Sequence, residues 1–354
     1  MSLLSPTLTA EAALAERFDL IGRQLHLRAE TPTACLAWQH ELRSRLRAMT
    51  GIDTMQYCAL DPELDPPIAL DGYTRQRLTI AVEPGMRMSL YLLRPADLRD
   101  GERRAAIIAP HGHGGGGKES VAGRDDIAYI APSITRYNYD YGVEFARAGF
   151  IVFCPDARGF GERREQSMQE DPDLLGGSCR VINNMAMPLG QTITGMWAWD
   201  LMRLIDYIET RADCDAARIG CAGLSGGGLQ TLWLAALDER IRCAIISGYF
   251  YGYKDSLLHM NQNCSCNYVP GLWQLADIGD IAALIAPRPL LIESGSRDPL
   301  NGARGLENVR EQIAITTPAY RLLGTEDAFA HSVFDGEHRW DGADAIPWLQ
   351  RWLG

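Results

Sequence analysis

The spacing of hydrophobic and polar positions changes along the chain, and the change separates two parts. In residues 1–60 apolar side chains such as Trp38, Leu42 and Leu46 recur at helical spacing up to Gly51, a residue that favours the end of a helix. From Tyr73 onward the pattern is typical of strands, with a hairpin around a Pro-Gly turn. We therefore predict a helical extension over residues 1–60 and a second unit over residues 61–354.

Apolar runs alternate with helical patterns through the second part. The runs predicted to be strands are 105–110, 150–155, 218–224, 241–248, 286–295 and a short one at 319–323. Helices are predicted between them at 140–148, 194–211 and 229–237, with a last helix near the C-terminus. This alternation indicates an α/β fold with a mostly parallel sheet and helices on both faces. The irregular stretches 162–193 and 248–285 are predicted to be insertions.

The stretch between the strand 218–224 and the next helix has the pattern G-x-S-x-G, from Gly223 to Gly227. In a nucleophile elbow the glycines allow a sharp strand-to-helix turn, which presents the serine hydroxyl above the sheet. Ser225 is thus the candidate nucleophile. The amide of Gly226, at a helix N-terminus, is a candidate oxyanion donor. A glycine-rich turn with a helix-capping serine is the alternative.

The glycine-rich stretch Gly112–Lys118 follows the strand 105–110 and fits three patterns. It matches G-x-x-x-x-G-K, but Glu119 replaces the Ser or Thr that would bind magnesium, and it also matches the weak dinucleotide pattern G-x-G-x-x-G. The third pattern is an oxyanion loop, in which an amide near His113 or Gly114 faces the substrate carbonyl. Only the third also explains the elbow serine, so nucleotide binding is the less favoured alternative.

Asp298 and His338 follow Ser225 in the order Ser, Asp, His, which is the order of α/β-hydrolase triads. Each lies just after a predicted strand, so all three are expected at one edge of a parallel sheet. An imidazole is needed to take the serine proton, and a carboxylate orients the imidazole and stabilises its charged form. The alternatives left open are His331 as the base, and Glu293, Asp327 or Asp335 as the acid.

Five residues are predicted to bind substrate: Gly112, Gly114, Arg158, Tyr249 and Trp273. The two glycines belong to the predicted oxyanion loop. Arg158 could contact the substrate or could tie loops together. The aromatic residues could form a pocket wall, although an insertion with a small core of its own needs the same residue types.

The net charge of −11 argues against nucleic acid or an anionic membrane as a partner. No signal peptide and no membrane-spanning run is apparent, so a cytoplasmic protein with a small-molecule substrate is predicted. A homo-oligomer is left open. Nine cysteines, scattered mostly singly, are expected to be reduced core residues. His259, Cys264 and Cys266 suggest a zinc site, but Cys-x-Cys is not the usual spacing and no fourth ligand is evident, so no metal is predicted.

The Ser225 elbow, the His-Gly-His loop, Asp-Ala-Arg-Gly-Phe-Gly-Glu at 156–162, Asp298 and Gly-Glu-His-Arg-Trp at 336–340 together resemble a known family. They are similar to α/β-hydrolases of the acetyl-xylan-esterase-like and dienelactone-hydrolase-like branch, from about residue 30 to the C-terminus. The resemblance implies an eight-stranded sheet, no cofactor, and hydrolysis of carboxylic esters, with short acyl or acetyl groups expected, through an acyl-enzyme. A serine peptidase or amidase with the same residues is the alternative.

Overall fold

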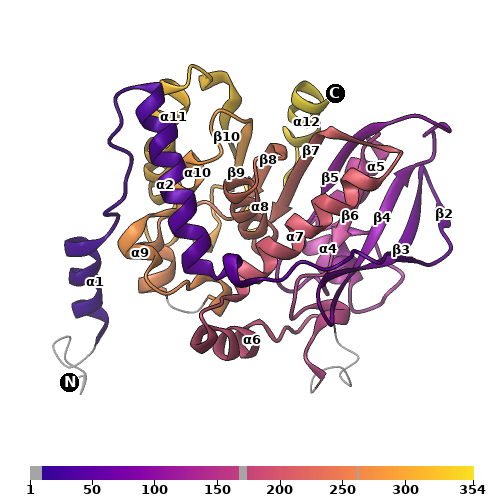
Figure 1. The fold of residues 1–354 in the computed structure, drawn as a ribbon, viewed down its shortest axis with the longest axis horizontal. Helices are drawn as coiled ribbons and strands as arrows, with labels where there is room; N and C mark the ends of the chain where they lie inside the picture. The colour runs from indigo at the N-terminus through magenta and orange to yellow at the C-terminus, as the bar shows by residue number, and fades with distance from the viewer. Residues whose placement is uncertain (1–9, 167–173, 261–262) are drawn as a thin grey trace.

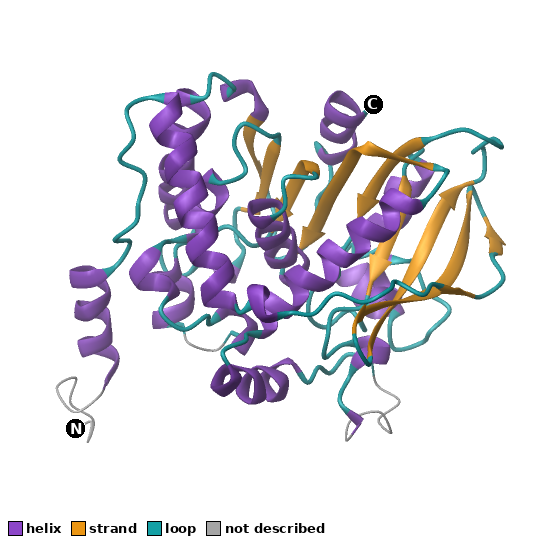
Figure 2. Ribbon diagram, in the orientation of Figure 1, coloured by secondary structure: helices purple, strands orange, loops and turns teal. Residues whose placement is uncertain are grey.

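The computed structural model describes residues 10–166, 174–260 and 263–354, and its centre is one mixed β-sheet (Figures 1 and 2). The strands are β1 (Glu63–Leu64), β2 (Ile68–Leu70), β3 (Tyr73–Glu83), β4 (Met86–Pro95), β5 (Arg104–Ile108), β6 (Ile151–Pro155), β7 (Cys214–Leu224), β8 (Ile241–Ser247), β9 (Leu290–Gly295) and β10 (Phe329–Phe334). The α-helices are α1 (Ala10–Ile21), α2 (Pro32–Thr50), α3 (Lys118–Val121), α4 (Ala131–Tyr137), α5 (Tyr141–Arg147), α6 (Cys179–Ala186), α7 (Ile193–Thr210), α8 (Gly226–Leu237), α9 (Leu272–Leu275), α10 (Ile278–Ala283), α11 (Leu306–Leu322) and α12 (Ala345–Leu353).

The strand order is β1-β3-β4-β6-β5-β7-β8-β9-β10, with β2 also paired to β3. The pairs from β6 through β10 are parallel, whereas β3 and β4 form the predicted antiparallel hairpin, and β4 pairs antiparallel with β6. Within the described residues the sheet has ten strands, two more than the eight expected, and it includes the short strands β1 and β2. The predicted α/β fold with a mostly parallel sheet is confirmed.

Two hydrophobic cores cover the two faces of the sheet. In β6, Ile151 and Phe153 belong to the larger core, under α2, α7, α8 and α10, while Val152 and Cys154 point into the smaller core under α5 and α12. Neighbouring residues of a strand face opposite sides, so a strand covered on both faces is apolar throughout. This is why the continuous apolar runs were correctly predicted to be strands.

The described residues of the N-terminal part contain the helices α1 and α2. Helix α2 begins at an N-cap, where the Thr31 side chain accepts a hydrogen bond from the Ala34 amide, and it ends at Gly51, whose φ of 78° suits glycine. Its buried residues, among them Trp38 and Leu42, pack in the larger core, and α2 contacts α7 and α8. In Figure 1 this helix crosses the same face as α7, while α1 lies at the edge of the molecule, in contact with α9.

The predicted short strand at 319–323 is wrong, because the segment is the end of helix α11 and the next strand is β10. The buried face of α11 includes Gln312 and Thr316, and Gln312 accepts a hydrogen bond from the amide of Gly279 (3.0 Å). These polar residues hide the helical period, and Pro318 lies inside the helix.

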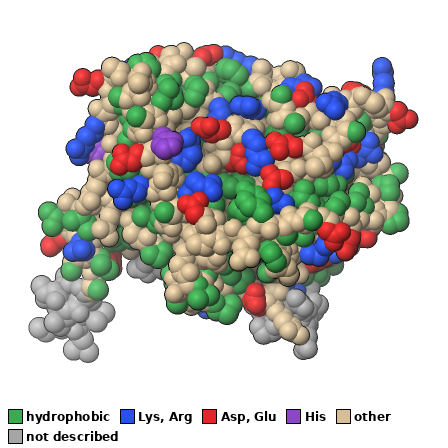
Figure 3. All heavy atoms as spheres, in the orientation of Figure 1, with side chains coloured by type: hydrophobic (Ala, Val, Ile, Leu, Met, Phe, Trp, Pro, Cys, Tyr) green, Lys and Arg blue, Asp and Glu red, His purple; other side chains and the backbone are tan. Residues whose placement is uncertain are grey.

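The two predicted insertions carry short helices. The first holds α6, and its residues 167–173 lie outside the described part of the chain. The second holds a π-helix (Lys254–His259), a 3₁₀ helix (Ser265–Asn267), α9 and α10. Among the described helices, none is both long and apolar enough to cross a membrane. On the face shown in Figure 3, acidic and basic side chains lie interspersed. Such side chains form ion pairs, for example the half-buried Arg240–Asp206 pair (2.6 Å).

Candidate active site

Ser225 occupies a strained turn between β7 and α8, with φ 60° and ψ −119°. A positive φ is uncommon for a residue other than glycine, and it indicates a backbone conformation that the surroundings impose. The flanking glycines allow it: a Cβ added to Gly223 would lie 2.7 Å from the carbonyl carbon of Gly227, and one added to Gly227 would lie 2.2 Å from the Pro110 oxygen. The steric role predicted for these glycines therefore agrees with the turn that the structure contains.

Asp298 and His338 come together at the same sheet edge. His338 Nδ1 lies 2.7 Å from Asp298 Oδ2, and the Asp298 side chain is 2% exposed. The imidazole also lies against the end of β8, because a Cβ added to Gly248 would be 3.0 Å from His338 Cε1. The Ser225 amide donates to the Ser247 oxygen (2.8 Å), next to that glycine. The Ser225 backbone and the His338 ring thus both lie beside Ser247–Gly248, and Asp298 is joined to them through its hydrogen bond with His338.

The alternative residues lie elsewhere. His331 is inside β10, where its Nε2 is buried with no hydrogen-bond partner among the described residues, and burial with the nearby Arg310 lowers its pKa to about 4. Asp335 pairs with Arg297, and Asp327 pairs with Arg351 (2.8 Å) on the surface. Within the described part of the chain, neither Asp335 nor Asp327 forms a hydrogen bond or an ion pair with His338.

Glu293, the remaining alternative acid, has a different position in the structure. Its buried carboxylate accepts hydrogen bonds from the Ser247 hydroxyl (2.6 Å) and from the amides of Asp341 (2.9 Å) and Gly342 (2.7 Å). Burial raises its pKa, although these three hydrogen bonds oppose the rise. Glu293 therefore fastens the segment just after His338 to β8 and β9. Sequence reasoning missed this role, since a Glu inside an apolar strand gives no sign of its partners.

The loop after β5 lies directly beside the serine. A Cβ added to Gly112 would be 3.1 Å from the Ser225 Cβ and 2.4 Å from the Tyr139 hydroxyl, so only glycine fits. That hydroxyl donates to the His113 oxygen (2.8 Å), which fixes the loop. Gly226 is the first residue of α8, where an amide has no partner within the helix. Gly114 has φ 72°, and its oxygen accepts from Ser133 (2.8 Å).

The nucleotide-binding interpretation of Gly112–Lys118 is wrong. The Lys118 amine is fully buried and lies 2.6 Å from Asp156 and 2.7 Å from Glu162. Burial alone would lower the pKa of Lys118, but attraction to Asp156 and the neighbouring glutamates outweighs it, so the pKa is raised. A lysine enclosed by carboxylates cannot reach a phosphate. The apparent motif is instead part of a buried ion-pair network beside the oxyanion loop.

The remaining predicted binding residues are spread out. Arg158 is a clamp, the second of its two predicted roles: its guanidinium binds the buried Asp200 (2.7 Å) and also Glu83 (2.7 Å). Tyr249 is buried just after β8, against Tyr251. Trp273 lies away from the candidate active site and packs against Phe18 of α1. It lines a cavity, and none of Ser225, Asp298 and His338 is among the described residues of that lining.

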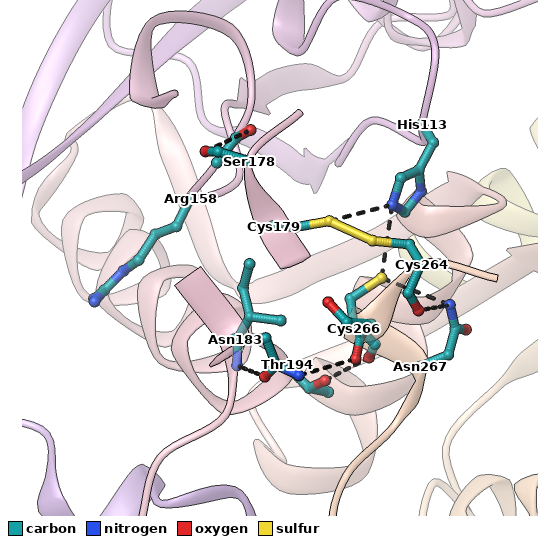
Figure 4. Close-up of a disulfide and its surroundings, with 12 residues drawn as sticks. His113, Arg158, Ser178, Cys179, Asn183, Thr194, Cys264, Cys266 and Asn267 are labelled. Atoms are coloured by element: carbon teal, nitrogen blue, oxygen red, sulfur yellow. Dashed lines mark hydrogen bonds between the residues drawn. A yellow bond between two sulfur atoms is a disulfide. The ribbon is translucent and has the colours of Figure 1, made fainter. Parts of the chain in front are cut away.

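The cysteines correct the expectation that all are reduced. Cys154, Cys221 and Cys243 are buried free thiols in the core, as predicted. Cys179 of α6 and Cys264 of the second insertion, however, form a disulfide beside His113 (Figure 4). His259, which sequence reasoning grouped with Cys264, instead lies near Glu11 of α1 (3.4 Å).

No protein-family model matches the chain. A Bacillus subtilis (strain 168) protein named "Putative hydrolase YtaP" is 29% identical over 258 residues, covering 70% of this chain and 78% of that protein. The "Carbohydrate esterase MZ0003" of an unknown prokaryotic organism is 29% identical over 276 residues, covering 68% of this chain and 61% of its own length. A crystal structure described as a "putative acetyl xylan esterase" from Bacteroides fragilis NCTC 9343 has a TM-score of 0.76 at 18% identity, covering 97% of this chain and 95% of that one.

The fold, with an elbow serine at the carboxyl edge of its sheet, is that of the α/β-hydrolases. Within this class, the neighbours include the acetyl xylan esterase named above and a glucuronoyl esterase from Solibacter usitatus, which has a TM-score of 0.67 at 17% identity and covers 94% of this chain and 98% of that one. The predicted resemblance to the esterase branch is confirmed.

Proposed function

We propose that the protein is a serine hydrolase that cleaves carboxylic esters with short acyl groups, acetyl among them. The observation that carries the proposal is the Asp298–His338 hydrogen bond of 2.7 Å at the turn that also holds the Ser225 backbone. The relatives and structural neighbours with named activities are esterases, which favours ester over other substrates.

The reaction begins with attack of Ser225 Oγ on the ester carbonyl carbon. His338 Nδ1 faces Asp298, so its Nε2 is the nitrogen that takes the serine proton. Asp298 stays ionised and stabilises the imidazolium. The amides of Gly226 and His113 bind the oxyanion of the tetrahedral intermediate, where preorganised donors act most strongly.

Collapse of the intermediate breaks the bond to the alcohol, which leaves with the proton returned by His338, and the acyl group stays on Ser225. Water then attacks the acyl-enzyme, with His338 again taking and returning a proton, and a carboxylic acid is released. No cofactor enters these steps. The buried Tyr139, through its bond to the His113 oxygen, keeps the loop in place while charge develops.

The test is labelling with a fluorophosphonate probe together with a panel of esters. We expect stoichiometric labelling of the native chain and none of Ser225→Ala, because the probe reacts with an activated serine. Labelling that survives Ser225→Ala would contradict the assignment. A panel of p-nitrophenyl esters of increasing chain length, acetylated xylan and methyl glucuronate would define the acyl and alcohol groups.

The peptidase alternative is tested by the same preparation. A p-nitroanilide matched to the best ester in its acyl group should be turned over much more slowly, since the amine is the poorer leaving group. Faster anilide than ester turnover would favour a peptidase or amidase with the same three residues.

A further inference from the structure

Four potential metal-binding side chains from three remote segments converge beside the candidate oxyanion loop (Figure 4). They are His113 after β5, Cys179 at the start of α6, and Cys264 and Cys266 of the second insertion. Their ligand atoms all lie within 4.8 Å of one another. The Ser225, Asp298 and His338 chemistry uses none of the three sulfurs, so the cluster needs an explanation of its own.

We propose that this cluster, in its reduced form, binds one zinc ion through His113 Nε2 and the Sγ atoms of Cys179, Cys264 and Cys266. One histidine and three cysteines form a common structural zinc set, with Zn–S near 2.3 Å and Zn–N near 2.0–2.1 Å. In a tetrahedron with those bond lengths, nitrogen and sulfur ligands are about 3.6 Å apart. His113 Nε2 lies 3.6 Å from Cys266 Sγ and 4.0 Å from Cys179 Sγ.

The separation of the backbones also suits a shared ion. The Cα atoms of Cys179 and Cys264 are 7.5 Å apart. Disulfides usually join cysteines with Cα atoms roughly 4.4–6.8 Å apart. Two thiolates on one metal ion have sulfur atoms farther apart than a disulfide does, about 3.8 Å, so they suit a wider backbone. The zinc and the disulfide are thus alternative states of the same pair of cysteines.

The surroundings hold the ligands in place, as the groups around metal sites do. The Asn267 side-chain nitrogen, Nδ2, lies 3.6 Å from Cys266 Sγ and donates to the Cys264 oxygen (2.9 Å). The Thr194 hydroxyl donates to the Cys266 oxygen (2.6 Å). Phe160 packs edge-on against the His113 ring, with centroids 5.0 Å apart, which limits rotation of that ring.

Zinc binding replaces the three thiol protons, so one Zn²⁺ is exchanged for three H⁺ and the occupied site carries a net charge of −1. All four positions are filled by protein atoms, which is typical of a structural and not a catalytic zinc. The ion would join both insertions to the oxyanion loop. The His113 ring already contacts the elbow helix, since a Cβ added to Gly226 would be 2.7 Å from His113 Nδ1. A reducing compartment, such as the predicted cytoplasm, favours this state over the disulfide.

The experiment compares zinc binding before and after reduction. A phosphine reductant with water opens the disulfide, giving two thiols and the phosphine oxide. After anaerobic removal of the reductant, we expect the full chain to take up one zinc per molecule, measured by elemental analysis. Cobalt(II) in its place should show the intense thiolate-to-metal absorption of a tetrahedral site. The oxidised chain should bind neither ion at this stoichiometry.

Matched cysteine variants identify the ligands. Cys266→Ser leaves the disulfide pair intact, yet we expect it to weaken zinc binding more than 10-fold and to reduce the cobalt thiolate absorption. Cys179→Ser should act similarly, whereas Cys58→Ser, outside the cluster, should match the native chain. Failure of the reduced chain to bind zinc, or equal binding by Cys266→Ser, would overturn the proposal and leave a disulfide only. Ser225→Ala should keep its zinc, so this result is independent of the hydrolase proposal.

Discussion

Two regions meet at Ser225, and they are built in different ways. The edge formed by β7, β9 and β10 carries Ser225, Asp298 and His338, and backbone pairing of parallel strands sets their spacing. The cluster of His113 with the three cysteines is held by side chains from loops and insertions. The strand edge should therefore keep its geometry whatever the state of the sulfurs, whereas the cluster should respond to redox state and metal.

The comparison also separates two histidines. His338 has a buried carboxylate partner that stabilises its charged form, as a proton carrier needs. The His113 ring faces sulfur atoms, and burial lowers its pKa to about 4. One imidazole is thus placed to exchange protons and the other to remain neutral.

The largest effect is expected for the base itself. His338→Ala should lower kcat for ester hydrolysis by roughly 10⁴-fold or more, because it removes the imidazole that we propose takes the serine proton. His331→Ala should keep activity within about 10-fold, since His331 is inside β10. Steady-state kinetics on a p-nitrophenyl ester measures both. A larger loss of kcat for His331→Ala than for His338→Ala would show that His331 of β10 is the general base.

The next largest effect is expected for the carboxylate. Asp298→Asn should keep the fold but stabilise the wrong imidazole tautomer, lowering kcat by roughly 10⁴-fold. Glu293→Gln is the matched control, because it removes a buried charge near the same loop without touching His338. We expect this control to lose stability more than activity. Equal kcat losses in the two variants would show that loop position, and not the Asp298 charge, limits the reaction.

The strand edge could be predicted from the sequence, whereas the sulfur cluster could not. The elbow, the order of Ser225, Asp298 and His338, and the parallel sheet were predictable, because glycine spacing and apolar runs are local patterns. His338 lies beside Asp298, although the strand before it was predicted at 319–323 and is in fact β10. The sulfur cluster was not predictable, since Cys179 is 85 residues from Cys264 and only folding brings them together. Cys264-x-Cys266 was the one local signal.

Protonation of His331 in β10 should make the free energy of unfolding depend on pH. The folded pKa of His331, about 4, lies below the ordinary 6.5 because the ring is buried and near Arg310. The unfolded chain therefore binds more protons between these values. Stability is fully present above about pH 6.5 and decreases by about 2 kcal/mol, after allowance for partial exposure, as the pH falls to about 4.

His331→Gln should flatten that part of the curve, measured by urea unfolding of the oxidised chain at a series of pH values. The exposed His40, replaced by Gln, is the control and should reproduce the native curve. An unchanged slope in His331→Gln would mean that other groups cause the acid sensitivity, and His331 would lose its place as the buried neutral histidine of this region.

The smallest effect is expected where the two regions are joined. Tyr139→Phe removes the hydrogen bond to the His113 oxygen and should lower stability by about 1 kcal/mol. Tyr320→Phe is a matched control: its buried hydroxyl also donates to a backbone oxygen, that of Arg288 (2.7 Å), away from Ser225. Both variants should lose similar stability.

Only Tyr139→Phe should lower kcat, by up to about 10-fold with little change in KM, because the loop contributes its amide mainly to the transition state. Equal kcat values in the two variants would show that the sulfur cluster alone is enough to hold the oxyanion loop.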